Sequence, residues 1–186
     1  MVEVSMKRSI CLYCGSHSGT NPAFAADAAA LGQAVAARGW RLVYGGGNVG
    51  LMGVAARAAV AVGGQVIGVI PRALLEREQG FTEASELIIT ETLRERKALM
   101  FERSDSFVAL PGGFGTLEET VETLTLRQLR YHNKPIYLLD TAGFFQPLLQ
   151  FFEHARASGF IHPDHFHLFT VTRSVPELMD LLDHGA

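Results

Sequence analysis

The sequence has few cysteines, no excess of positive charge and no long uninterrupted apolar run. Its two cysteines, Cys11 and Cys14, are too few for a disulfide framework or a four-cysteine zinc site. Both fall in one expected strand, where an offset of three residues turns their side chains to opposite faces. We therefore expect two buried thiols in a reducing cytosol and not a redox pair.

The charge and the hydropathy pattern argue against two classes of partner. The formal net charge is −3, which gives no general attraction for nucleic acid or for an anionic membrane. The most apolar long stretch, residues 54–70, is interrupted by an arginine, two glycines and a glutamine, whereas a membrane-spanning helix needs about 20 mainly apolar residues. The first ten residues also lack the apolar core of a secretory signal peptide. We expect a cytoplasmic protein that binds neither nucleic acid nor a membrane.

The length and the order of the expected elements predict the fold class. Of the 186 residues, 48% are hydrophobic and 19% charged, which is typical of a globular domain with a sizeable core. No linker, repeat or low-complexity segment divides the chain, so residues 1–186 are expected to form one domain. We expect strands at residues 9–13, 41–44, 65–70, 87–90, 107–110 and 135–139, and helices at residues 22–38, 50–62, 91–103, 116–131, 144–157 and 175–182.

This alternation predicts a doubly wound, Rossmann-like parallel sheet in three α/β/α layers. Ligands bind such sheets at the carboxyl ends of the strands. Glycine-bearing turns follow three of the expected strands, at residues 14–20, 45–53 and 111–116. We expect these turns to gather at one edge of the sheet.

The stretch 106–119, S-F-V-A-L-P-G-G-F-G-T-L-E-E, holds a strand, a turn and the start of a helix. Pro111 ends the strand because proline lacks a donor for the ladder. The turn allows close approach of the backbone to a ligand, and it contains Gly112, Gly113, Phe114 and Gly115.

Thr116 is predicted as the N-cap of the following helix, with Glu119 completing a capping box three residues later. Backbone N–H groups and the helix dipole converge at such a start, so the turn predicts an anion site beside Glu119. The alternative is an ordinary turn between a strand and a helix, with a capping glutamate and no ligand.

The turn at residues 45–50 matches the dinucleotide fingerprint G-x-G-x-x-G. It follows the second strand instead of the first, and no acid lies about twenty residues further on to hold a dinucleotide ribose. We interpret it as a turn that approaches a mononucleotide, and we expect no nicotinamide, flavin or other cofactor.

The expected helix at residues 91–103 carries a basic pair on its apolar side. Leu93 and Met100 lie seven residues apart and mark one stripe. Arg96 and Lys97 fall within that stripe, where a charge needs a partner or a ligand. The alternatives are a pair that reaches the rim on its aliphatic stems or that forms ion pairs with neighbouring glutamates of the same helix.

Together these elements resemble the Lonely guy family of cytokinin riboside 5′-monophosphate phosphoribohydrolases, whose relatives have often been labelled lysine decarboxylases. The turn after the central strand matches the family's P-G-G-x-G-T-x-x-E, and residues 45–53 resemble its G-G-G-x-x-G-L-M-G element. Residues 14–16, C-G-S, also resemble the family, and the basic pair resembles its M-H-x-R-K, with Leu93-Arg94 in place of Met-His. The resemblance runs from about residue 9 to residue 139.

The resemblance implies the roles of the candidate site residues. Arg96 and Glu119 would be the catalytic pair. The residues that would contact the nucleotide or its phosphate are Lys97, Gly112, Gly113, Phe114, Gly115, Thr116, Ser16, Gly46, Gly47 and Met52. The family also implies a homodimer or larger homo-oligomer. On the helix at 116–131 we expect Leu117, Val121 and Leu124 to face the sheet, and Leu126 and Leu129 to lie in the subunit interface.

The chemistry can be reasoned from the residues alone. Hydrolysis of an N-glycosidic bond passes through an oxocarbenium-like state that Glu119 can stabilise, or Glu119 can activate water or act as a nucleophile. Arg96 does not release its proton near neutral pH, so orienting Glu119 or a substrate oxygen is its expected work. Such a step needs no metal, and we interpret the histidines at 162, 165 and 167 as a solvated loop instead of a zinc site.

We therefore expect hydrolysis of N6-modified adenosine 5′-monophosphates to the free base and ribose 5-phosphate. One alternative is a general nucleosidase for AMP and other purine monophosphates. Another is a non-catalytic nucleotide-binding or carrier module, because the glycine turns alone would bind phosphate. A lysine decarboxylase would need a cofactor lysine or similar machinery, for which the sequence holds no motif.

Overall fold

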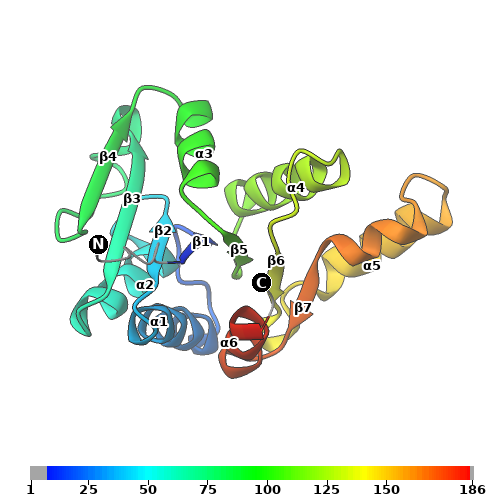
Figure 1. The fold of residues 1–186 in the computed structure, drawn as a ribbon, viewed down its shortest axis with the longest axis horizontal. Helices are drawn as coiled ribbons and strands as arrows, with labels where there is room; N and C mark the ends of the chain where they lie inside the picture. The colour runs from blue at the N-terminus through cyan, green and yellow to red at the C-terminus, as the bar shows by residue number, and fades with distance from the viewer. Residues whose placement is uncertain (1–7, 185–186) are drawn as a thin grey trace, which may run out of the picture.

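The computed structural model describes residues 8–184 and centres on one sheet of seven parallel strands (Figure 1). The strands are β1 (Ser9–Tyr13), β2 (Arg41–Tyr44), β3 (Gln65–Pro71), β4 (Glu86–Thr90), β5 (Ser106–Ala109), β6 (Ile136–Leu139) and β7 (Thr170–Thr172). Their order is β4-β3-β2-β1-β5-β6-β7. The order reverses between β1 and β5, and this switch point is where doubly wound sheets bind ligands.

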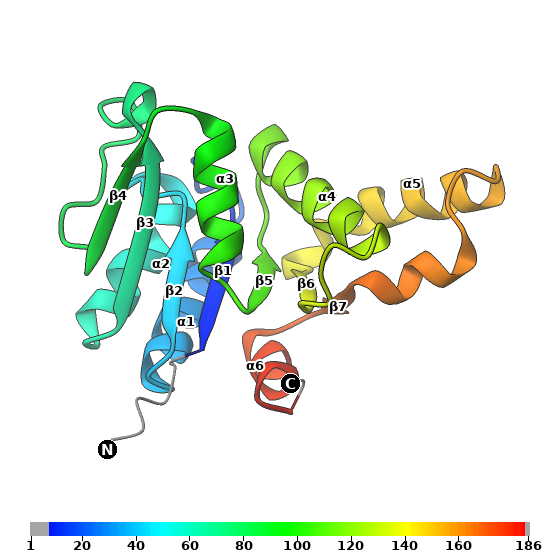
Figure 2. The same ribbon diagram turned by 45° about the horizontal axis from the view of Figure 1, so that its top comes forward.

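Between residues 8 and 184, six α-helices cover the two faces of the sheet, which confirms the predicted three-layer α/β fold (Figures 1 and 2). They are α1 (Pro22–Ala37), α2 (Gly50–Ala61), α3 (Leu93–Glu102), α4 (Phe114–Gln128), α5 (Gln146–Ala157) and α6 (Val175–His184). Helices α1, α2 and α6 share one core, and α3, α4 and α5 share the other. Within the described residues, no helix is both long and apolar enough to span a membrane.

The two cores follow from alternation along the strands. In β1, Ile10 and Leu12 enter the core beneath α1, while Cys11 and Tyr13 enter the core beneath α3. Cys14 lies just beyond β1, not within it as predicted, and belongs to the core of α1. Both cysteines are buried free thiols.

Some element predictions were wrong. Strand β7 was not expected, because three residues of alternating threonine and valine give little periodic signal. Helix α4 begins at Phe114 with Gly113 as its N-cap, so Thr116 lies inside the helix and forms no capping box with Glu119. The capping box belongs to α3 instead, where Thr92 Oγ1 accepts from Glu95 N at 3.1 Å.

The predicted apolar stripes of α3 and α4 were also partly wrong. Leu93 is 57% exposed, whereas Met100 is buried. On α4, Val121 points outward, and the buried residues are Thr116, Thr120, Thr123 and Leu124. Two of these threonine hydroxyls find an acceptor within the helix: Thr120 Oγ1 donates to the Thr116 carbonyl oxygen at 2.6 Å, and Thr123 Oγ1 donates to the Glu119 carbonyl oxygen at 2.8 Å.

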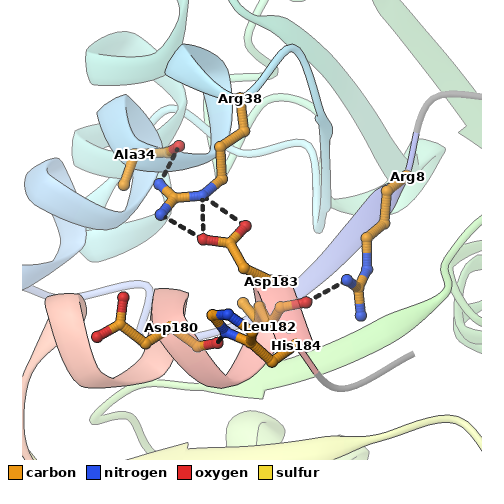
Figure 3. A network of polar contacts seen from close by, with 7 residues as sticks. All are labelled: Arg8, Ala34, Arg38, Asp180, Leu182, Asp183 and His184. Carbon is orange, nitrogen blue, oxygen red and sulfur yellow. Dashed lines mark hydrogen bonds and ion pairs between the residues drawn. The ribbon is translucent and has the colours of Figure 1, made fainter.

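A polar cluster connects α1, α6 and the start of β1 near the amino ends of the strands (Figure 3). Arg38 donates from Nε and Nη2 to the carboxylate of Asp183, at 2.9 Å and 2.7 Å, which ties α1 to α6. Arg8 donates to the carbonyl oxygen of Leu182, and both arginines lie against the ring of Trp40. The carboxyl ends of the strands, at the opposite edge, remain open for a site.

Candidate active site

A cavity of about 410 Å³ lies at the carboxyl ends of β1, β2 and β5, on the switch point of the sheet. All three predicted glycine turns contribute to its wall, and α3 and the connection between β3 and β4 complete it. The lining residues are Leu12, Cys14, Gly15, Ser16, His17, Ser18, Gly19, Phe24, Gly45, Leu51, Met52, Glu78, Arg96, Pro111, Gly112, Gly113, Phe114, Gly115, Thr116, Glu119 and Phe144.

The turns pack against one another through their backbones. Gly15 N donates to the Pro111 carbonyl oxygen at 3.0 Å, and Leu51 N donates to the Gly15 carbonyl oxygen at 3.0 Å. A Cβ atom at Gly112 would lie 2.1 Å from Thr116 Oγ1 and 2.8 Å from Gly15 N. Glycine is therefore required at position 112 by contacts within the protein itself.

Gly113 and Gly115 differ from Gly112, because a Cβ atom at either would meet nothing within 4 Å. Gly113 caps α4 without a side-chain hydrogen bond, so the first backbone N–H groups of the helix have no side-chain acceptor from their cap. The free space beside Gly113 and Gly115, and the backbone N–H groups that no capping side chain occupies, together form a surface suited to an anion.

Arg96 is buried in the wall of the same cavity, with 8% of its surface exposed. Its Nη2 donates to the Gly45 carbonyl oxygen at 3.1 Å. Its Nε is buried and has no hydrogen-bond partner among residues 8–184. A Cβ atom at Gly45 would lie 1.9 Å from Nη2, so the guanidinium occupies space that exists because position 45 has no side chain.

Glu119 points into the same cavity from the second turn of α4. Burial raises the pKa of its carboxyl group from 4.5 to about 7. The positive charges of Arg96 and Lys97 oppose this rise, while Glu118 and Glu78 add to it. A carboxyl group with a pKa near neutral pH is suited to exchange a proton with a bound substrate.

The cavity brings together most, but not all, of the predicted site residues. Arg96, Glu119, Ser16, Met52 and the turn 112–116 line it. Three predicted residues lie outside the lining: Lys97, Gly46 and Gly47.

Each of these three has contacts elsewhere. Lys97 forms ion pairs across to α4, with Glu118 and with Glu122, the latter at 3.0 Å. The Gly46 carbonyl oxygen accepts from Phe81 N at 2.9 Å, and Gly47 bridges to the connection after β3. The alternative in which the basic pair forms ion pairs with neighbouring glutamates of the same helix is not observed for either residue.

Several lining residues were not predicted. His17 follows β1, so the rule that ligands bind at strand ends could have found it. Phe24 and Phe144 come from distant segments and meet edge to face at 5.7 Å. Glu78 reaches the cavity from a connection without a motif. Only the fold brings the last three to the site.

The three late histidines lie apart from this cavity, in or beside the short 3₁₀ helix Pro163–Leu168. His162 pairs with Asp164 at 3.5 Å, and its ring lies 5.7 Å from that of His165. Within residues 8–184, no cluster of three or more His, Cys, Asp or Glu side chains is placed to hold a metal ion.

Comparison with known proteins gives the family of the chain. A family model described as "Possible lysine decarboxylase" matches residues 52–182. A probable cytokinin riboside 5′-monophosphate phosphoribohydrolase from Oryza sativa subsp. japonica is 46% identical over 182 residues, 98% of this chain and 80% of the relative. A cytokinin riboside 5′-monophosphate phosphoribohydrolase from Arabidopsis thaliana is 41% identical over 183 residues, again 98% and 80%. The chain belongs to the Lonely guy family.

Solved structures share the fold of this Lonely guy family member. The molybdenum cofactor binding protein from Rippkaea orientalis has a TM-score of 0.71 and 25% identity, covering 97% of this chain and 98% of that one. The molybdenum cofactor carrier protein from Chlamydomonas reinhardtii has a TM-score of 0.74 and 25% identity, covering 96% and 97%. The fold is thus found both in proteins named as hydrolases and in proteins named as carriers.

Proposed function

We propose that the chain is a phosphoribohydrolase that cleaves N6-modified adenosine 5′-monophosphates into the free base and ribose 5-phosphate. One observation carries the proposal: Arg96 and Glu119 enter the same cavity as the open, uncapped start of α4. The proposal is supported by the names of curated relatives at 41–46% identity. The substrate in their names, a cytokinin riboside 5′-monophosphate, has a phosphate that suits the start of α4 and a glycosidic bond on which Glu119 and Arg96 can act.

The 5′-phosphate would bind at the start of α4. Gly113 and Gly115 leave room for phosphate oxygens next to the backbone, and the helix dipole favours a negative charge there. Glu119 lies on the same helix and lines the same cavity, so we place the sugar of the bound nucleotide beside this carboxyl group. The nucleotide is the small-molecule partner that we propose for the chain.

At the sugar, water would replace the base. The C1′–N bond breaks and a water oxygen bonds to C1′; one water proton stays on the new C1′ hydroxyl, and the other is passed, through Glu119 or solvent, to the departing base. Glu119 serves this step in its ionised form, either by accepting the water proton, by attacking C1′ or by stabilising the positive charge on the sugar. Arg96 remains protonated and orients the carboxylate or a substrate oxygen.

Two alternatives stay open to the same test. A general purine-monophosphate nucleosidase would use the same residues with unmodified AMP as its main substrate. A non-catalytic carrier is favoured by the names of the solved structures at 25% identity. The buried guanidinium and the carboxyl group with a pKa of about 7 favour catalysis over carriage.

We also propose a homodimer or larger homo-oligomer in the cytosol, with α4 at the subunit contact. Val121 and Leu129 on α4 are 41% and 59% exposed, and Tyr131 just beyond it is 75% exposed. Free, buried Cys11 and Cys14 suit a reducing compartment. Light scattering at low micromolar concentration should give at least twice the 20.2 kDa mass of one chain. An active species with the mass of one chain would end the oligomer proposal.

The deciding experiment is chromatography after incubation with a panel of nucleoside monophosphates. We expect release of the base from N6-(isopentenyl)AMP and from AMP, with the ratio of their kcat/KM values separating the first two functions. Binding without release of any base, by protein shown to be folded, would favour the carrier and refute the hydrolase.

A further inference from the structure

A second carboxylate, that of Glu78, lies in the wall of the cavity. It comes from the connection between β3 and β4, and its backbone is fixed to the glycine turn after β2. Asn48 N donates to the Glu78 carbonyl oxygen at 2.8 Å, and Gly47 and Gly80 form an antiparallel bridge two residues away. Glu78 is thus fixed by the same turn that positions Arg96.

One oxygen of the Glu78 carboxylate has no hydrogen-bond donor within the described part of the protein. This oxygen, Oε2, is enclosed by protein atoms and accepts no hydrogen bond from any residue between 8 and 184. No arginine or lysine of that range forms an ion pair with it. A buried carboxylate oxygen without a donor is costly. Glu78 lines the cavity, so a ligand bound there can supply a donor to its carboxylate.

The donors of the proposed substrate are the two ribose hydroxyls and the exocyclic amino group of the base. The 2′-hydroxyl sits on the carbon next to C1′, where Glu119 acts. Glu78 is close enough to Glu119 for its charge to raise the pKa of that carboxyl group. The amino group lies at the far end of the purine from the bond that breaks, and in N6-modified bases it keeps only one hydrogen. These positions favour a ribose hydroxyl.

We propose that Glu78 binds the ribose by accepting a hydrogen bond from the 2′-hydroxyl, and so makes the site selective for ribonucleotides over 2′-deoxyribonucleotides. This assignment rests on the proposed function, because it takes Glu119 as the group next to C1′. A hydrogen bond from the 2′-hydroxyl to a carboxylate strengthens as positive charge develops on the sugar. Glu78 therefore contributes to turnover as well as to binding.

The test compares two variants with two substrates. Wild-type protein should turn over AMP about tenfold to a hundredfold better than 2′-deoxy-AMP, the range of one charge-assisted hydrogen bond. Glu78→Ala should lose about that factor in kcat/KM with AMP and little with 2′-deoxy-AMP, and Glu78→Gln should fall between. Glu76→Ala is the matched control, since Glu76 lies on the same connection and is exposed.

Binding of the sugar phosphates gives a second measurement that needs no turnover. By calorimetry, Glu78→Ala should weaken ribose 5-phosphate about tenfold or more and leave 2-deoxyribose 5-phosphate nearly unchanged. Equal losses with both sugars, or no loss with either, would overturn the assignment. An unchanged affinity for ribose 5-phosphate with a weaker affinity for adenine would place Glu78 at the base instead.

The two proposals fail in distinguishable ways. If the wild-type protein releases no base from any nucleoside monophosphate, the proposed function fails, and the sugar-phosphate binding still decides the role of Glu78. If the wild type is active and Glu78→Ala keeps both its activity and its preference for ribose, only the ribose assignment fails.

Discussion

The carbonyl oxygen of Gly45 accepts a hydrogen bond from Nη2 of Arg96 at 3.1 Å, and a Cβ atom at position 45 would lie 1.9 Å from that same nitrogen. The turn after β2 therefore both binds the guanidinium and leaves the space that it occupies. The glycine-rich turn thus holds a side chain as well as forming part of the cavity wall.

Gly45→Ala should displace the guanidinium of Arg96 without unfolding the protein. We expect kcat to fall about a hundredfold or more, as misplacement of a group by about 1 Å can do. The melting temperature should fall by only a few degrees, because the arginine can move toward the cavity. Steady-state kinetics and thermal unfolding of the variant check this, and full kcat in Gly45→Ala would show that Arg96 need not occupy the observed position.

Glu119→Gln and Arg96→Ala should each lower kcat/KM about 10²- to 10⁴-fold, the usual contribution of a positioned proton-transfer group or its partner. Glu118→Gln is the matched control for the carboxylate. Glu118 lies outside the cavity lining and pairs with Lys97 near the surface, where such a pair contributes about 0–1 kcal/mol. If Glu118→Gln abolished turnover and Glu119→Gln did not, the wrong carboxylate would have been assigned.

The pH profile should show the titration of Glu119. Its pKa of about 7 means that the carboxyl group is protonated below neutral pH and ionised above it. If the ionised form is the active one, kcat/KM should fall tenfold per pH unit on the acid side, with an apparent pKa of about 7. The residual activity of Glu119→Gln should lack this limb, and a wild-type limb near pH 4.5 would contradict the role.

The same titration affects stability in a stated direction. The folded state holds the Glu119 proton up to about pH 7, whereas the unfolded chain releases it near 4.5. The wild type should therefore lose stability as the pH rises through that window, by up to about 3 kcal/mol. Urea denaturation should show Glu119→Gln gaining more stability over the wild type at pH 8 than at pH 5. An equal difference at both values would contradict the raised pKa.

Gly113→Ala tests the phosphate position. The protein leaves a Cβ atom at residue 113 free of contacts within 4 Å, so the variant should fold and lose about 1 kcal/mol or less of stability. A methyl group at the start of α4 should weaken ribose 5-phosphate binding and raise KM for AMP.

Wild-type protein should also prefer AMP to adenosine by about tenfold or more, because charge-assisted hydrogen bonds contribute about 1.5–3 kcal/mol each. Equal turnover of AMP and adenosine would place the phosphate elsewhere.

Much of the fold could be predicted because local pattern and global arrangement agree. The run at β5 and the glycines that follow it specify a strand, a turn and a helix, and all three are present. The start of α4 was misplaced, because Thr116 has the chemistry of an N-cap but is buried inside the helix. Strand β7 gave too short a pattern to recognise.

The candidate site was predicted where its residues belong to motifs. Arg96, Glu119 and the turn 112–116 meet as the motif spacing indicates. Lys97 was wrongly expected in the cavity: it forms an ion pair with the neighbouring helix α4 instead. Sequence spacing cannot distinguish a charge that points into a cavity from one that pairs with a neighbouring helix. Glu78 could not be found, since the fold of the connection after β3 brings it to the wall.

The uncapped helix start and Glu119 lie on one continuous helix, so a fixed length separates them. From Gly113 to Glu119 the rise is about 9 Å at about 1.5 Å per residue, and thermal motion of loops cannot change it. Arg96 lies on a different helix, α3. Breathing of α3 against α4 would thus change the distance of the guanidinium from the carboxylate while leaving the reach from phosphate to carboxylate constant. In a nucleoside diphosphate or triphosphate whose terminal phosphate bound at the helix start, the sugar would lie too far from Glu119, or to one side of it, for reaction. The fixed distance along α4 would therefore select substrates by the number of their 5′-phosphates.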